Sequence, residues 1–173
     1  EQIIKNLYEV VLEDLTKQPQ VLCHFDFESR NLMMLKNGNT GVLDFQDATF
    51  GPIFLDPVSL LRDLYFEMSE KELDNLLDLF INRASKLGLI EKVRISKIKR
   101  SFNLTGLQRQ LRIMGTLSRL YLRDQKSFRL PDLNQTLSYA IKSSSDCYEL
   151  QEFSQFLVTT VLPKLTLTLK EVL

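Results

Sequence analysis

Two short stretches decide how this sequence folds: His24-Phe25-Asp26-Phe27-Glu28-Ser29-Arg30-Asn31 and Leu43-Asp44-Phe45-Gln46-Asp47-Ala48. Between them, two apolar runs are separated by Asn37-Gly38. Asn-Gly between apolar runs is a strong signal for a tight turn that joins two antiparallel strands. We therefore expect a β-hairpin over residues 31–45, which brings Asn31 and Asp44 to the same end.

Working outward, the sequence on both sides is mainly helical in pattern. Residues 2–17 repeat apolar side chains every three or four positions, which predicts an amphipathic helix that ends at Gln18-Pro19-Gln20. The apolar residues 21–23 predict a short buried strand. The segment around Gly51-Pro52 is expected to be a loop.

Helical patterns continue from Asp56 to residue 173. Asp56 is expected to cap a helix with Pro57 at its first position. The apolar side of this helix is expected to comprise Val58, Leu60, Leu61, Leu64 and Tyr65. Ser69-Glu70-Lys71-Glu72 is a capping box, which predicts a helix that ends at Gly88. Further helices are expected over residues 92–123 with a break near 101–103, over 131–145, and over 150–173 with an interruption at Pro163.

The composition fits one globular domain. Of the 173 residues, 44% are hydrophobic and 25% are charged. The 22 Lys and Arg balance the 22 Asp and Glu, so net charge favours neither nucleic acid nor an anionic membrane as a partner. No apolar run approaches the roughly 18 residues of a membrane span, and the first residues do not resemble a signal peptide.

The fold class predicted from these patterns is α+β and mainly α. We expect one domain over residues 1–173: a helix (1–20), loops with a hairpin (21–55) and a helical subdomain (56–173).

Cysteine and histidine usage narrows the chemistry. Cys23 and Cys147 are far apart and form neither a disulfide framework nor a metal-ligand spacing, so we expect two buried thiols in a reducing cytoplasm. His24 is the only histidine, which excludes a multi-histidine metal site. Gly106 and Gly115, inside a helical pattern, are expected to allow close helix packing.

One charged segment could suggest a different partner. The basic side chains between residues 92 and 100 have helical spacing, and we interpret them as a solvated helix face rather than a nucleic-acid surface. They are Lys92, Arg94, Lys97, Lys99 and Arg100.

The polar residues of the two opening stretches are the types that phosphoryl transfer from a nucleotide requires. One carboxylate must orient the acceptor hydroxyl and accept its proton. Hard oxygen ligands must hold Mg²⁺ against the phosphates, because catalysis is mostly positioning and charge neutralisation. Asp26 fits the first role, and Asn31 and Asp44 fit the second.

These stretches resemble the catalytic loop and metal motif of protein kinases, and more closely those of the aminoglycoside phosphotransferase superfamily. The run Gly51-Pro52-Ile53-Phe54-Leu55-Asp56 and the residues that follow resemble a further element of that superfamily. Ser29–Met33, Gly41–Ala48 and Ser59–Asp63 are similar to the bacterial anomeric kinases for N-acetylmuramate and N-acetylglucosamine of cell-wall recycling.

The resemblance implies a fold, a reaction and roles for several residues. The chain would be the carboxy-terminal lobe of a kinase-like protein that phosphorylates a small molecule, an amino sugar, with ATP and Mg²⁺. Asp26 would be the base, Asn31 and Asp44 metal ligands, and His24 and Asp56 supports of the catalytic loop. The remaining candidates for contact with the substrate, or for support of those contacts, are Glu28, Arg30, Gln46, Asp47 and Arg62.

The sequence also departs from the family. Phe25 stands where Arg or Gly is expected, and Glu28 where this subfamily more often has His, which puts the acceptor sugar in doubt. No glycine-rich phosphate loop is found among the 6 glycines, so we expect an amino-terminal lobe to be missing and the exposed surface to self-associate. Two alternatives stay open: an aminoglycoside-, choline- or homoserine-type kinase, and an inactive isolated lobe.

Overall fold

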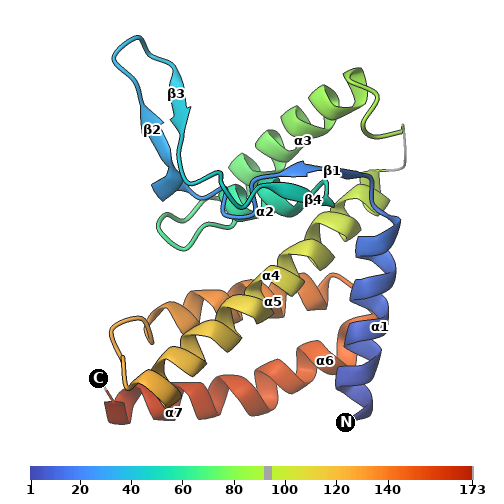
Figure 1. Cartoon of the computed structure of the whole chain (residues 1–173). Helices are drawn as coiled ribbons and strands as arrows, with labels where there is room; N and C mark the ends of the chain where they lie inside the picture. Colours follow the sequence, from blue (N-terminus) through green and yellow to red (C-terminus); the bar gives the residue numbers. More distant parts are fainter. Residues whose placement is uncertain (92–94, 173) are drawn as a thin grey trace. The chain divides into compact units, whose positions relative to one another are not determined.

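The computed structural model describes residues 1–91 and 95–172 (Figure 1). The chain divides into two compact units: residues 1–15 with 103–173 form unit 1, and residues 16–102 form unit 2. The mainly helical α+β character predicted from sequence is confirmed. The division into one domain with three sections stays a prediction.

Unit 2 contains the four strands of the described residues, in two antiparallel pairs. β2 (Leu32–Met34) pairs with β3 (Thr40–Val42), so that Leu32 lies opposite Val42. The turn between them has Gly38 at a φ of 78°, a conformation that glycine adopts without steric cost. The predicted hairpin is therefore confirmed.

Of the other pair of strands, one strand was predicted from the sequence and its partner was not. β1 (Gln20–Cys23) is the expected short strand, and it pairs with β4 (Thr49–Pro52). The expected loop around Gly51-Pro52 is therefore wrong. Pro52 is tolerated because it is the last residue of a strand at the edge of a two-stranded sheet. The strand is not uniformly buried: Cys23 is buried and Leu22 is exposed.

Two helices of unit 2 follow the strands, and one differs from its prediction. α2 (Leu55–Leu61) has Phe54 at its N-cap, so Asp56 lies inside the first turn and is not the cap. α3 (Glu70–Lys86) has the predicted capping box between Ser69 and Glu72.

The end of α3 is also as predicted. Gly88 has a φ of 71°. The N–H of Gly88 donates to the Ser85 carbonyl and that of Leu89 to the Ala84 carbonyl, a Schellman motif. The core of unit 2 packs these helices against the start of α4 (Ile95–Asp124); it includes Phe54, Val58, Leu77, Ile98 and Phe102.

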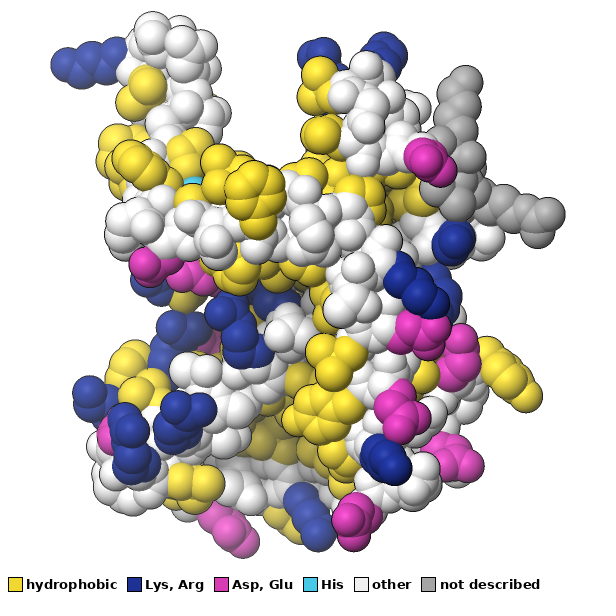
Figure 2. Space-filling view, turned by 45° about the vertical axis from the view of Figure 1, so that its right-hand side comes forward, with side chains coloured by type: hydrophobic (Ala, Val, Ile, Leu, Met, Phe, Trp, Pro, Cys, Tyr) yellow, Lys and Arg dark blue, Asp and Glu magenta, His cyan; other side chains and the backbone are white. Residues whose placement is uncertain are grey.

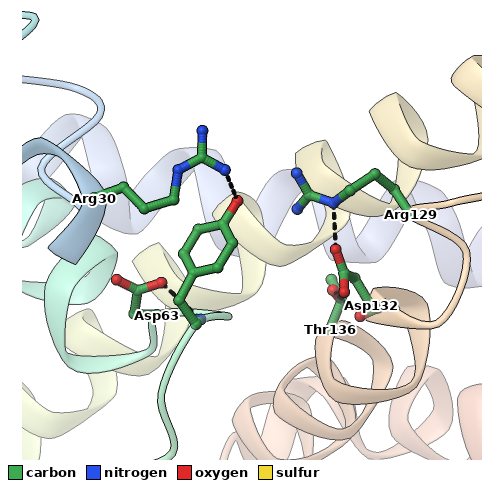
Figure 3. Close-up of polar contacts among 6 residues, drawn as sticks. Arg30, Asp63, Arg129, Asp132 and Thr136 are labelled. Carbon is green, nitrogen blue, oxygen red and sulfur yellow. Dashed lines mark hydrogen bonds and ion pairs between the residues drawn. The ribbon is translucent and has the colours of Figure 1, made fainter.

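Unit 1 is helical, with α1 (Gln2–Lys17), most of α4, and α5 (Asp132–Ser145). Its core includes Leu7 and Val11 of α1, Leu104 and Leu107 of α4, and Leu137 of α5. Arg129 forms an ion pair with Asp132 at the start of α5, and the Thr136 hydroxyl donates to the Asp132 carbonyl at 2.7 Å (Figure 3). The break expected near residues 101–103 is wrong, since α4 runs through it without interruption.

The last helical segment accommodates a proline. After the 3₁₀ turn Tyr148–Leu150 and α6 (Gln151–Phe156), the π-helical turn Leu157–Val161 leads into α7 (Leu162–Val172). A proline ring clashes with the carbonyl four residues earlier, and a wider π turn opens that position. The interruption predicted at Pro163 is therefore realised just before it.

Other predictions from sequence have mixed outcomes. Both cysteines are buried, as predicted. Gly115 is exposed, and a Cβ there would meet no atom within 4 Å, so close packing at this position is wrong. Of the basic segment, Lys97 is exposed and Lys99 pairs with Asp74 at 2.8 Å, while Lys92 and Arg94 lie outside the described residues.

None of the helices in the described residues combines the length and the apolar character needed to cross a bilayer.

Candidate functional site

The loop between β1 and β2 is fixed by a carboxylate from α2. Oδ2 of Asp56 accepts from the His24 N–H at 2.7 Å, and Oδ1 accepts from the Phe25 N–H at 3.0 Å. Backbone donors in a tight loop need partners, and an ionised acceptor makes such bonds short and strong. Asp56 is in the first turn of α2, so the loop is tied to the rigid end of a helix.

Phe25 explains a glycine in β4. The φ of Phe25 is 74°, in the left-handed region that non-glycine residues seldom occupy. A Cβ at Gly51 would lie 3.3 Å from the ring of Phe25 and 3.6 Å from Sγ of Cys23. The ring of Phe25 therefore packs where β4 has no side chain, and this contact supports the unusual backbone of the loop.

His24 links the loop to the residue that directly follows β3, the second strand of the hairpin. Its Nε2 lies 2.8 Å from the carbonyl oxygen of Leu43, and because a carbonyl only accepts, Nε2 carries the proton. The imidazole is buried and packs edge-on against Phe27, with ring centroids 5.8 Å apart. The contact fixes the backbone immediately before Asp44.

Of the three residues predicted to carry the chemistry, Asp26 and Asn31 are joined directly by a hydrogen bond, and Asn31 is bonded to the residue before Asp44. The side-chain Nδ2 of Asn31 donates to the Asp26 carbonyl at 2.8 Å, and the Glu28 N–H donates to the same carbonyl at 2.8 Å. The carbonyl of Asn31 in turn accepts from the Leu43 N–H at 2.9 Å. Asp26 and Asn31 are thus close, and Asn31 is bonded to the neighbour of Asp44.

The donor set of Asn31 and Asp44 fits a hard cation. Since Nδ2 of Asn31 is committed to the Asp26 carbonyl, its Oδ1 is the atom left for a ligand. Asp44 is exposed, with a φ of 62°, and its Oδ1 accepts from Nε2 of Gln46 at 2.7 Å, the one side-chain contact of this carboxylate within residues 1–91 and 95–172. Among the described residues, no group of three or more His, Cys, Asp or Glu could hold a metal ion. Mg²⁺ in kinases takes one or two side chains and completes its shell with phosphates and water, so this pair fits it.

The other predicted candidates lie in different surroundings. Asp47 is exposed and makes no hydrogen bond with the described residues. Arg62 is 3% exposed and its guanidinium lies 5.1 Å from the centre of the Phe102 ring. Glu28 is half-buried and Arg30 is exposed.

Two residues of this site were given no role from the sequence. Asp63, 1% exposed, accepts from the Ser29 N–H at 2.7 Å through Oδ2 and from the Tyr65 N–H at 3.0 Å through Oδ1. Tyr65 accepts a hydrogen bond from Arg30. Figure 3 shows Arg30 and Asp63 at the two ends of this set of contacts. The sequence signal that could have pointed to Asp63 is an acidic residue placed just after the apolar residues of α2.

The same carboxylate that fixes the loop acts on a neighbouring thiol. Burial, and secondly the negative charge of Asp56, raise the pKa of Cys23 to about 11. Its thiol lies 3.5 Å from the Pro52 carbonyl. Cys23 is therefore a protonated packing group and not a nucleophile.

Comparison with known proteins gives consistent matches. A family model described as "Phosphotransferase enzyme family" matches residues 1–88. An N-acetylmuramate/N-acetylglucosamine kinase of Neisseria meningitidis serogroup B is 38% identical over 160 residues, which are 92% of this chain and 48% of that protein.

Two pseudomonad relatives carry the same name. The kinase of Pseudomonas aeruginosa is 30% identical over 90% of this chain and 46% of its own length. That of Pseudomonas putida is 31% identical over 76% of this chain and 38% of its own length. The chain therefore spans about half the length of the curated relatives it matches.

Proposed function

This chain belongs to the phosphotransferase enzyme family, and on that premise we propose that the full-length protein transfers a phosphoryl group from ATP to a small-molecule hydroxyl. The acceptor we propose is the anomeric hydroxyl of N-acetylmuramate or N-acetylglucosamine, the sugars in the names of its relatives. The observation that carries the proposal is the hydrogen-bonded loop that joins Asp26 to Asn31 and Asn31 to the residue before Asp44.

Asp26 is the proposed general base. Its side chain is exposed on the loop, where an acceptor hydroxyl can reach it. A base contributes only if it is held within hydrogen-bonding reach of the proton it accepts. In this proposal, the bonds from the backbone of His24 and Phe25 to Asp56 and from Asn31 to the Asp26 carbonyl hold it there.

Asn31 and Asp44 are the proposed ligands of Mg²⁺. A bound Mg²⁺ would neutralise charge that develops on the transferred phosphoryl group. The role of the protein residues is to present hard oxygens from two segments. We propose that His24, by donating to the Leu43 carbonyl, keeps the Asp44 segment in register with the loop.

The test is turnover by the full-length protein and its Asp26→Asn variant. We expect the substitution to lower kcat by about 10²–10⁴-fold, the usual contribution of a general base. Asp78→Asn, which neutralises an exposed carboxylate on α3, is the matched control and should keep normal kcat. Undiminished turnover by the Asp26→Asn variant would remove Asp26 from the mechanism.

The acceptor is tested separately with a panel that includes both amino sugars, an aminoglycoside, choline and homoserine. We expect phosphorylation of the amino sugars. Phosphorylation of choline or homoserine without the sugars would keep the reaction class and replace the acceptor.

A further inference from the structure

Arg30 is an exposed cation that follows the proposed base in the same loop, and no carboxylate among the described residues pairs with it. Its side chain donates to the hydroxyl of Tyr65, and its guanidinium carbon lies 4.7 Å from the centre of the Tyr65 ring. An arginine without an acidic partner, held on an aromatic ring, keeps most of its five N–H donors for a ligand.

The position of Tyr65 is itself fixed by the loop. The buried carboxylate of Asp63 accepts from the Ser29 N–H at 2.7 Å and from the Tyr65 N–H at 3.0 Å. Ser29 directly precedes Arg30, so one carboxylate holds the backbone next to the arginine and the backbone of Tyr65, on which the arginine rests. The guanidinium is therefore pre-organised, and ligand binding would cost little side-chain entropy.

Arg30 is also close in the chain to the proposed chemistry. Its neighbour Asn31 donates to the Asp26 carbonyl at 2.8 Å. Arg30 and Asn31 belong to the turn Ser29–Asn31, and Asp26 lies in the loop just before this turn. Arg30 and Asp26 therefore belong to one short loop whose backbone is hydrogen-bonded. The ligand chemistry that suits a guanidinium fork is a planar oxyanion.

The two sugars in the names of the relatives differ in this chemistry. N-acetylmuramate carries a carboxylate, and N-acetylglucosamine is neutral. We propose that Arg30, supported by Tyr65, binds the carboxylate of the acceptor and thereby favours N-acetylmuramate over N-acetylglucosamine. This inference rests on the proposed function. Arg30 is the contact residue, and Tyr65 and Asp63 are positioning residues.

The experiment compares kcat/KM of the full-length protein for N-acetylmuramate, its methyl ester and N-acetylglucosamine. The ester has nearly the size of the acid and lacks its charge. For Arg30→Gln we expect kcat/KM for N-acetylmuramate to fall about tenfold or more through a higher KM, as for loss of a charged hydrogen bond. The values for the two neutral acceptors should change less than about threefold.

Further variants separate contact from positioning. Arg30→Lys keeps the charge without the fork and should give an intermediate value for N-acetylmuramate. Tyr65→Phe keeps the ring and should lower the ratio of acid to ester less than Arg30→Gln does. Arg83→Gln, which removes another exposed guanidinium of unit 2, is the control and should leave the ratio unchanged.

Each other outcome has a defined meaning. An equal loss on all three acceptors would show that Arg30 only shapes the loop. A raised KM for ATP with unchanged KM for the sugars would assign the oxyanion to the nucleotide phosphates. Either result overturns the inference and leaves the proposed function standing. If the unaltered protein phosphorylates none of these sugars, the proposed acceptor fails first and the inference fails with it.

Discussion

At the scale of single residues, the candidate site depends on carboxylates that are distant in sequence from the loop they hold. Asp56 lies more than thirty positions in sequence from His24 and Phe25, and it accepts hydrogen bonds from their backbone N–H groups. Asp63 is also more than thirty positions from Ser29, from whose N–H it accepts. Each forms two hydrogen bonds from one side chain. The loop contains the short 3₁₀ turn Ser29–Asn31, and these individual side-chain contacts tie it to α2 and to the residues that follow that helix.

Replacing Asp56 by Asn tests this dependence. An amide has one acceptor oxygen and no charge, so at least one of the two loop N–H groups loses its partner. We expect Asp56→Asn to lower the free energy of unfolding by about 1.5–3 kcal/mol. Urea denaturation measures it, with Asp78→Asn as the control on the same unit; equal stability of the two variants would contradict the prediction.

Because of Cys23, we expect the free energy of unfolding to change with pH in the alkaline range. Its pKa is raised from an ordinary 9.0 to about 11, so the folded state keeps the proton after the unfolded state has released it. The stabilisation is complete below pH 9 and is lost as pH rises towards 11. We expect the stability advantage of the unaltered protein over Cys23→Ala to shrink across this window by up to about 2–3 kcal/mol.

The measurement is urea denaturation at several pH values from 8 to 11. Cys147→Ala, which removes the other buried thiol, is the matched comparison. If the difference between the unaltered protein and Cys23→Ala stayed constant over this range, the raised pKa would be excluded.

At the scale of elements, the features predicted correctly are those encoded locally. α1, the hairpin with its Asn37-Gly38 turn and the capping box of Ser69 each depend on residues within a few positions of one another. β4 was missed because a strand containing Gly-Pro is recognised only through its partner β1, nearly thirty positions away. The local Gly-Pro signal predicts a loop, and the pairing of β4 with β1 overrides it.

The length of α2 was overestimated for a related reason. Its apolar pattern continues to Leu64 and Tyr65, but the helix ends at Leu61. The Asp63 side chain accepts from the Tyr65 N–H and so replaces a helical bond, as short polar side chains do at turns. The roles of Asp26, Asn31 and Asp44 stay predictions from the sequence, and the contacts of Asp56 and Asp63 that hold their loop could not be predicted because they join residues more than thirty positions apart.

α4 allows a direct test of helix propensity. Gly115 is exposed in the interior of this helix of 30 residues, and a Cβ there would touch nothing within 4 Å. Gly115→Ala should raise the free energy of unfolding by about 0.5–1 kcal/mol, because alanine loses less backbone entropy in a helix. Urea denaturation measures the change; a loss of stability would reveal a contact at this position.

At the scale of the whole molecule, unit 2 carries exposed apolar side chains on its strands. Leu22 and Phe50 are opposite each other in register and are 68% and 72% exposed. On and beside the hairpin, Met33, Met34 and Phe45 are 50%, 78% and 65% exposed. Figure 2 shows hydrophobic side chains at the surface over these strands. We define the facing pair Leu22 and Phe50, which share one face of the β1–β4 pair, as the strand patch.

The strand patch leads to a prediction about association. A facing pair of large apolar side chains, both mostly exposed, is a candidate contact surface, and the chain spans about half the length of its curated relatives. We therefore expect this chain, produced alone, to associate with a second copy through the strand patch. A self-complementary interface of this kind would give a dimer with two-fold symmetry. Sedimentation velocity over a range of concentrations should show a rise in weight-average mass.

The decisive comparison uses substitutions that keep strand propensity. Leu22→Thr with Phe50→Thr removes this facing pair and retains β-branched residues that suit a strand, so the double variant should sediment as a monomer at concentrations where the unaltered chain is associated. Leu87→Thr alters an exposed leucine at the end of α3, 74% exposed and outside the strand patch, and should leave association unchanged. If the unaltered chain stays monomeric at high concentration, or if both variants weaken association equally, the strand patch is not the interface. Because the strands also carry the loop that contains Asp26, association there would compete with access to the proposed site.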